Sequence, residues 1–250
     1  MTMQSLELDD YDRVRYNRQM LLDGWGEAGQ RRIKNASVFI AGAGGLGSPV
    51  SMYLTAAGVG KIRLCDADTI ELSNLNRQIL HSDNRLRQLK AFSAERTLSA
   101  VNPSISIDVF TEYLEQDNAE RIIGTPDLIV DCLDNYATRY LLNTYCIKHH
   151  IPLVHAAVWG LMGQLSFIDP PETPCLRCIF PEAPPKGVFP VLGATPGVIG
   201  SLQAMETLKF LTGVGDLLKG KLLLFDGEDM SLTMLNLKHL PGCPDCGGGA

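Results

Sequence analysis

The stretch SVFIAGAGGLG, residues 37–47, joins an apolar run to a glycine-rich turn. The apolar run predicts a β-strand, and residues 48–57 place apolar side chains on one face of a predicted helix. Gly42, Gly44 and Gly47 fit the pattern GxGxxG, in which missing side chains allow a tight turn and let backbone amides approach a phosphate. The stretch therefore predicts a βαβ unit that binds a phosphorylated nucleotide.

The alternation of strand and helix continues along the chain. It is typical of a doubly wound parallel sheet. Two later strands are separated only by a short glycine turn, so we expect them to pair antiparallel. The predicted strands cover residues 37–41, 61–65, 105–110, 128–130, 153–158, 164–168, 221–225 and 232–237, and the predicted helices 48–57, 85–101, 117–123, 136–149 and 198–211. The predicted fold class is α/β: a doubly wound, mainly parallel, Rossmann-like sheet extended by antiparallel strands.

The bulk composition is that of an ordinary globular chain. With 250 residues, 45% of them hydrophobic and 20% charged, it predicts a single domain over residues 1–250. Residues 1–35 are predicted to form a helical N-terminal arm of one or two amphipathic helices. The net charge of −6, with both signs interspersed, argues against nucleic acid as a partner, because phosphate binding needs a concentrated basic surface.

Membrane insertion and secretion are not expected. The uncharged stretches 151–168 and 187–205 contain prolines and glycines, which suit buried strands and a loop that enters a helix better than a membrane span. The first thirty residues are acidic and lack the apolar core of a secretory signal, so we expect a cytoplasmic protein. In that compartment the seven cysteines should be thiols or metal ligands.

Polar residues that suit a nucleotide follow the second strand. Asp66 ends that strand, where a carboxylate can accept hydrogen bonds from ribose hydroxyls. A dinucleotide needs two phosphates neutralised, whereas Arg77 and Lys90 together favour a triphosphate. The alternative is that both are solvated surface cations. The candidate nucleotide-binding residues are Gly42, Gly44, Gly45, Gly47, Asp66, Asp68, Ser73, Asn74, Arg77, Gln78, Lys90, Asp134 and Asn135.

Asp134 and Asn135 follow the apolar strand 128–130, at the same predicted edge of the sheet. A carboxylate in this position can hold magnesium, which bridges phosphate oxygens and offsets their charge. The alternative is a helix N-cap, since Asp and Asn are favoured there. Both functions are compatible, with Asp134 as the metal ligand and Asn135 as the cap.

Two CxxC pairs predict one structural zinc site. Cys175, Cys178, Cys243 and Cys246 have the spacing that lets both sulfurs of each pair face a tetrahedral ion. Four thiolates leave no open position, so the zinc knuckle 175–178 and 243–246 should clamp the proline-rich loop 170–190 to the C-terminal segment. Redox chemistry is the competing interpretation, but it does not need a second pair. The remaining cysteines, Cys65, Cys132 and Cys146, are predicted to be core residues.

The order of these motifs resembles the MoeB/ThiF/HesA family of adenylating enzymes, bacterial relatives of the ubiquitin-activating enzyme. The resemblance runs from about Tyr16 to Gly247 and includes GAGGLG, DADTIELSNLNRQ, DCLDN, CLRC and PGCPDC. It implies that the C-terminal glycine carboxylate of a small ubiquitin-like sulfur carrier, ending in Gly-Gly, attacks the α-phosphate of magnesium ATP. The products would be an acyl adenylate and pyrophosphate, in sulfur transfer for molybdopterin or thiamin biosynthesis.

The resemblance also implies residue roles. Asp66 would bind ribose, Asn74 and Arg77 the nucleotide and phosphates, Lys90 the phosphates, and Asp134 the magnesium. Arg18, in YNRQ, matches the arginine that reaches across a homodimer into the neighbouring site, although from sequence alone it is an ordinary helix-surface residue. The catalytic candidates are therefore Arg18, Arg77, Lys90 and Asp134.

Three departures from the family pattern matter. Leu89 stands where a proline usually precedes the lysine, and Leu133 replaces a threonine. The loop cysteine that many relatives carry is missing between Cys178 and Cys243, where Lys186 or a close neighbour takes its place. We therefore expect adenylation only, with sulfur supplied by a separate sulfurtransferase.

Two alternative functions remain. A nicotinamide-dependent oxidoreductase shares the glycine turn but leaves Arg77, Lys90, Asp134 and the cysteines without a function. A nucleotide-binding scaffold that has lost catalysis would be favoured by disrupted phosphate contacts, whereas these residues are all present.

Overall fold

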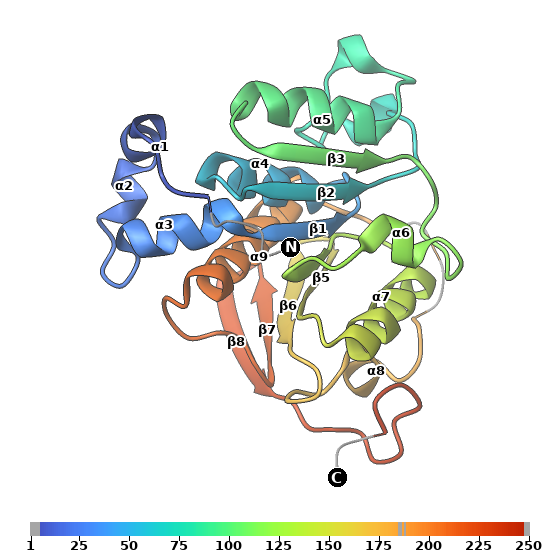
Figure 1. The fold of residues 1–250 in the computed structure, drawn as a ribbon. Helices are drawn as coiled ribbons and strands as arrows, with labels where there is room; N and C mark the ends of the chain where they lie inside the picture. Colours follow the sequence, from blue (N-terminus) through green and yellow to red (C-terminus); the bar gives the residue numbers. More distant parts are fainter. Residues whose placement is uncertain (1–5, 185–186, 188, 248–250) are drawn as a thin grey trace.

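The computed structural model describes residues 6–184, 187 and 189–247 and is built on one eight-stranded sheet (Figure 1). The strand order is β3-β2-β1-β4-β5-β6-β7-β8. Strands β1 to β5 pair parallel with one another, while the pairs β5–β6, β6–β7 and β7–β8 are antiparallel. The strands are β1 (Ser37–Ala41), β2 (Lys61–Cys65), β3 (Ser106–Phe110), β4 (Leu128–Asp131), β5 (Leu153–Trp159), β6 (Met162–Ile168), β7 (Lys221–Asp226) and β8 (Ser231–Asn236). The predicted fold class is confirmed.

Helices cover both faces of this sheet. Because side chains of a strand alternate between faces, Val38 and Ile40 of β1 join one buried cluster and Phe39 and Ala41 the other. The first cluster includes residues of α3, α4, α5 and α9, and the second residues of α6, α7 and α8. The helices are α1 (Asp10–Arg15), α2 (Asn17–Met20), α3 (Gly26–Asn35), α4 (Gly47–Ala57), α5 (Lys90–Val101), α6 (Ala119–Ile123), α7 (Tyr136–His149), α8 (Leu176–Ile179) and α9 (Ala194–Thr212), with short 3₁₀ turns η1 (Leu72–Asn74) and η2 (Asp83–Arg85).

Two predicted helix assignments were wrong in detail. The arm contains three short helices, because Tyr16 leaves helical geometry, and Gly24 and the first residue of α3, Gly26, adopt positive φ angles of 78° and 53°. The helix predicted over residues 85–101 begins only at Lys90, since Arg87 has a φ of 67°. Residues 1–5 of the arm lie outside the described part of the chain.

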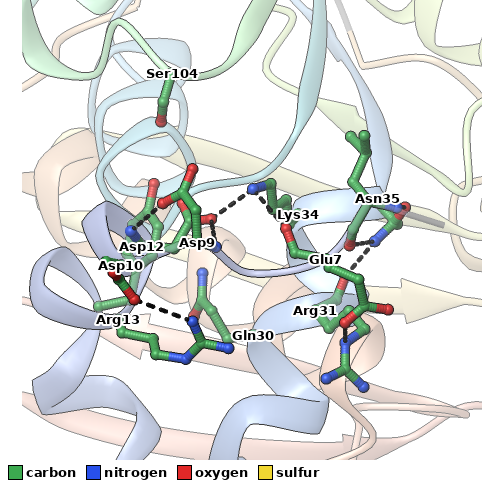
Figure 2. A network of polar contacts seen from close by, with 12 residues as sticks. Glu7, Asp9, Asp10, Asp12, Arg13, Gln30, Arg31, Lys34, Asn35 and Ser104 are labelled. Atoms are coloured by element: carbon green, nitrogen blue, oxygen red, sulfur yellow. Dashed lines mark hydrogen bonds and ion pairs between the residues drawn. The ribbon is translucent and has the colours of Figure 1, made fainter.

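The N-terminal arm is anchored by polar contacts (Figure 2). Asp9 and Asp12 form a reciprocal capping box at the start of α1. Asp12, which is buried, also pairs with Lys34 of α3 at 2.5 Å. The Tyr16 ring lies against Gly58, where an added Cβ would sit 2.4 Å from the ring. Gly58, the C-cap of α4, lies at the amino-terminal ends of the parallel strands. The arm that contacts it therefore lies at that end, away from the arrow tips (Figure 1).

The uncharged stretches contribute strands and a helix to this packing: residues 151–168 contain β5 and β6, and residues 194–205 belong to α9. Within the described residues, we find no helix with the length and hydropathy that crossing a bilayer requires.

Candidate functional site

The glycine turn lies between the carboxyl ends of β1 and β4, where the strand order reverses direction. In sheets of this kind ligands bind at that crevice. Gly42 has a φ of 102°, and a Cβ there would lie 2.7 Å from the Cys132 carbonyl oxygen. A Cβ at Gly47 would lie 2.0 Å from the Gly42 carbonyl oxygen. These two glycines are therefore required by backbone packing, irrespective of any ligand.

Gly44 and Gly45 occupy the more open side of the turn. A Cβ at Gly44 would meet nothing nearer than the Gln78 amide nitrogen at 3.6 Å. At Gly45 the nearest atoms belong to Pro196 at 3.3 Å, with the Arg77 stem at 3.6 Å. The loop that carries residues 77 and 78 thus packs against the turn, as the nucleotide prediction requires.

Asp66 fixes the turn from the end of β2. Its carboxylate accepts hydrogen bonds from the Ala43 amide at 2.8 Å and from the Asp68 amide at 2.9 Å. Burial raises the pKa of Asp66 above its usual value, although nearby Lys90 and the two amide donors oppose the shift. The structure therefore places an acid beside the glycine turn, in the position expected of a ribose acceptor.

Lys90 is the first residue of α5, and its side chain is only 8% exposed. Its Nζ lies 2.9 Å from the Asp68 carboxylate, and its amide donates to the Asp68 carbonyl at 2.8 Å. Lys90 is therefore a buried ammonium held by one exposed acid. Leu89 before it has a φ of −63°, the value that a proline ring would impose, so the departure from the family pattern leaves the loop geometry intact.

The loop after η1 brings two further predicted residues to the turn. Arg77 donates through Nη1 to the Ser73 carbonyl and to Asn76 Oδ1, both at 2.9 Å. The Gln78 side chain is buried, and its Oε1 has no hydrogen-bond partner among the described residues. A buried amide oxygen without a partner is costly, which marks this position as one where a ligand donor would be accommodated.

Ser73 and Asn74 make local contacts instead. The Ser73 hydroxyl donates to the Glu71 carboxylate at 3.3 Å, and Asn74 Oδ1 accepts from the Glu71 amide at 3.1 Å. The structure does not bring the exposed Ser73 side chain to the glycine turn. The side-chain nitrogen of Asn74, Nδ2, has no hydrogen-bond partner in the described part of the chain, so it can still donate to a ligand.

Asp134 lies three residues beyond the end of β4, and Cys132 between them contacts the glycine turn. The Cys132 amide, two residues earlier, donates to the Ala41 carbonyl of β1 at 2.9 Å. Asp134 is exposed, and within residues 6–184, 187 and 189–247 its carboxylate has no hydrogen-bond partner. An open carboxylate fits magnesium, which takes one or two carboxylates together with substrate phosphates. Asn135 caps α7 by accepting from the Thr138 amide at 3.0 Å, as the alternative interpretation predicted.

Arg18 lies on α2, in the arm at the amino-terminal ends of the parallel strands, opposite the glycine turn. Its neighbour Gln19 donates to the Ala57 carbonyl at the end of α4, 2.8 Å away, and α4 runs from the glycine turn towards the amino edge. Arg18 is exposed. One chain therefore does not bring Arg18 to its own glycine turn.

The four predicted zinc ligands come together. Cys175 Sγ lies 3.6 Å from Cys243 Sγ and 3.8 Å from Cys178 Sγ, and Cys178 Sγ lies 3.4 Å from Cys246 Sγ. All four sulfurs are within 4.8 Å of one another. Tetrahedral zinc–sulfur bonds of about 2.3 Å give sulfur separations of roughly 3.8 Å, so the cluster fits a zinc ion. Cys65, Cys132 and Cys146 are buried core residues, as predicted.

The sequence reasoning missed several groups near the site. His81 is buried and links the Ala43 carbonyl at 3.0 Å to the Ser93 hydroxyl of α5 at 2.9 Å. Burial lowers the pKa of His81, so the imidazole bridges the turn and α5 in its neutral form. A single histidine outside any motif gave no signal. Asp131, Arg139 and His155 form a second buried group at the end of β4.

Comparison with known proteins identifies the family of this chain. The ThiF family model matches residues 16–245. The chain belongs to the ThiF family. Among ThiF-family relatives, the SAMP-activating enzyme E1 of Haloferax volcanii is 40% identical over 98% of this chain and 93% of its own length. The sulfur carrier protein adenylyltransferase of Thermus thermophilus is 42% identical over 93% and 90%.

Other matches extend beyond this chain. The adenylyltransferase and sulfurtransferase MOCS3 of Drosophila ananassae is 44% identical over 96% of this chain, which spans only 55% of that relative. Among solved structures, Escherichia coli MccB in complex with MccA-N7isoASN has a TM-score of 0.85 at 24% identity, covering 94% of this chain and 74% of that one. The structural match shows that this ThiF-family chain shares the MccB fold.

Proposed function

We propose that this protein is an ATP-dependent adenylyltransferase that activates the C-terminal glycine of a small ubiquitin-like sulfur carrier ending in Gly-Gly. The observation that carries the proposal is that Asp66 and Gln78 lie against the glycine turn at the crevice of the sheet, while Lys90 pairs with Asp68, whose amide Asp66 binds. The names of the relatives from Haloferax and Thermus support the same activity and the same class of partner.

Catalysis by this site rests on positioning and charge. The attacking carboxylate is already ionised at neutral pH, so the reaction needs no strong general base. Asp66 would accept the ribose hydroxyls, while Arg77 and Lys90 would bind the phosphates and stabilise the leaving pyrophosphate. Asp134 would hold the magnesium ion, which offsets phosphate charge when bound.

A groove near the end of β3 suits the adenine ring. It has a volume of about 440 Å³ and lies between the segment after β3 and the first turn of α7. Tyr113, Leu114, Ala137 and Leu141 supply apolar surface there. The backbone connects it to the site, because the Asp66 amide donates to the Phe110 carbonyl at 3.0 Å. We assign this groove to the base of the nucleotide.

The wider proposal includes the parts that one chain does not contain. Residues 1–250 act as one adenylation domain, and a homodimer supplies Arg18 of each subunit to the other's site. The four cysteines hold structural zinc. A separate sulfurtransferase supplies sulfur, because the chain has no cysteine between Cys178 and Cys243; Lys186, in that loop, lies outside the described residues. The protein works in the cytoplasm, for molybdopterin or thiamin synthesis.

Exchange of labelled pyrophosphate into ATP tests the proposal. Exchange should require a carrier ending in Gly-Gly, and Lys90→Gln should lower its rate by roughly 100-fold or more because a phosphate-binding charge is lost. Lys148→Gln, at an exposed lysine of α7, is the matched control and should leave the rate unchanged. Absence of exchange with every Gly-Gly carrier of the host would instead identify a scaffold that has lost catalysis.

A further inference from the structure

A buried carboxylate ends β4, three residues before Asp134. Asp131 is fully buried. Its Oδ1 accepts from the Leu133 amide at 3.0 Å, and its Oδ2 accepts from His155 Nδ1 at 2.7 Å and lies 3.2 Å from Arg139 Nε. Although burial alone would raise it, Arg139 and His155 hold the pKa of Asp131 below its usual value. Asp131 is therefore an ionised group inside the protein.

Arg139 also binds the loop that follows β4. Its side chain, on the second turn of α7, is only 4% exposed. Its Nη2 donates to the Leu133 carbonyl and to the Ala156 carbonyl of β5, the latter at 2.9 Å. Both backbone polar groups of Leu133 are thus bound by the side chains of one ion pair.

The residue after Asp134 is fixed as well. Asn135 caps α7 through the Thr138 amide, so the backbone is held on each side of Asp134 while its own carboxylate stays exposed. The ion pair contacts only the backbone of Leu133, whose side chain packs against the second buried cluster. A backbone held in this way fixes the direction in which the Asp134 side chain leaves the loop, so fewer conformations are left to be ordered when its carboxylate binds a metal.

A buried ion pair is an expensive way to stabilise a fold. Removing two charges from water costs several kcal/mol per ion, and well-packed apolar side chains of the same volume are often as stable or more so. The pair therefore calls for an explanation beyond stability, and its contacts to Leu133 supply one.

We propose that the Asp131–Arg139 ion pair positions Asp134 for binding of magnesium–nucleotide. Arg139 is thus a positioning residue, acting through the backbone of Leu133 without touching the ligand. The inference rests on the proposed function, because it assumes that Asp134 is the magnesium ligand.

The test is the magnesium dependence of nucleotide binding, measured by calorimetry with a non-hydrolysable ATP analogue. Arg139→Lys keeps the charge opposite Asp131 but loses the planar fork that also reaches Leu133. It should raise the magnesium concentration for half-maximal binding by roughly 10- to 100-fold, the usual effect of losing a residue that orients a metal ligand. Asp134→Asn should abolish the magnesium dependence, and adding Arg139→Lys to it should have no further effect.

A second readout needs neither nucleotide nor metal. In Arg139→Lys, hydrogen exchange of the Leu133 amide should accelerate. The melting temperature, measured separately, should still indicate a folded protein. Lys209→Gln is the matched control, because it breaks a buried pair with Glu206 on α9, away from Asp134, and it should change neither readout.

The outcomes separate the two claims. Normal magnesium dependence and unchanged exchange of the Leu133 amide in Arg139→Lys would overturn the positioning role while leaving the proposed function intact. Additive effects of Arg139→Lys and Asp134→Asn would overturn it too. Failure of the wild-type protein to bind the analogue in magnesium would overturn the proposed function, and the positioning role with it.

Discussion

At the residue scale, Leu89 tests how far backbone geometry explains the family pattern. Its φ of −63° suits proline, and its amide donates no hydrogen bond within the described residues. Leu89→Pro should therefore raise the free energy of unfolding by about 0.5 kcal/mol, because proline restricts the unfolded chain. Urea denaturation measures the change. A decrease in the free energy of unfolding by more than about 0.5 kcal/mol would instead show that the loop before Lys90 needs a backbone conformation or an amide donor that proline cannot supply.

A pH prediction follows from Asp66. Its pKa is raised by burial, so on acidification it takes up a proton at a higher pH than an ordinary carboxyl does. A protonated Asp66 is a weaker acceptor for ribose hydroxyls. The affinity for ATP should therefore fall with decreasing pH while exposed carboxylates are still ionised, as measured by calorimetric titrations at several pH values.

Asp66→Asn is the control for that experiment. It should bind ATP more weakly at neutral pH and lack the acid-induced decrease. If the wild-type and Asp66→Asn proteins show the same pH dependence, another group is responsible.

Sequence could predict only residues with a local signal. Asp66 directly follows a strand and Lys90 lies in an amphipathic segment, and the structure places Asp66 beside the glycine turn and pairs Lys90 with Asp68. His155 and Arg139 could not be predicted, because their partner Asp131 lies 24 and 8 residues away and the contacts exist only once β4, β5 and α7 have packed. Asp131 itself had a weak signal, as an acid directly after a buried apolar strand.

At the element scale, the strands were predicted closely and the helix ends less well. The central strands are buried on both faces, so each appears in the sequence as an uninterrupted apolar run. The start of α5 was placed too early because the amphipathic pattern continues through Arg85, while the positive φ of Arg87 has no signature in a non-glycine residue.

The knuckle is tied to α7, the helix that starts after Asp134. Asp245, between Cys243 and Cys246, accepts from Asn143 of α7 at 2.7 Å and lies 3.6 Å from Arg177 of α8. Asn143 in turn accepts from the Leu176 amide at 2.8 Å. The cysteine cluster, α8 and α7 therefore form one connected unit.

Zinc removal should loosen this unit. Asp245→Ala should lower the free energy of unfolding by about 1–2 kcal/mol. For a chain of this size that lowers the melting temperature by roughly 2–8 °C. In chelator-treated protein the same substitution should have little effect, because the knuckle has already released α7. Scanning calorimetry with and without chelator measures both changes. Equal effects in the two conditions would mean that Asp245 binds α7 independently of the metal.

At the scale of the whole molecule, the arm and the glycine turn lie at opposite ends of the parallel strands (Figure 1). A site that uses Arg18 must therefore take it from another copy of the chain. Neither the sequence pattern nor one chain determines how two copies pack, so the dimer stays a prediction.

Subunit mixing tests this arrangement. Arg18→Ala and Lys90→Gln should each be nearly inactive alone. A mixed dimer contains one site with both native residues, so equal mixing should restore about a quarter of the wild-type exchange activity. Pyrophosphate exchange after co-refolding measures the recovery. Mixtures that remain as inactive as the separate variants would show that Arg18 acts within its own chain or not at all.

The Lys90–Asp68 pair has a consequence for how the nucleotide arrives. The ammonium is largely shielded from solvent and already neutralised, and the chain as a whole carries a formal charge of −6. An anion approaching from a distance therefore meets no strong attractive field, unlike the ligands of proteins that use electrostatic steering. Capture of the nucleotide depends on short-range contacts after collision, so added salt should not slow association and should speed it slightly by screening the like charges.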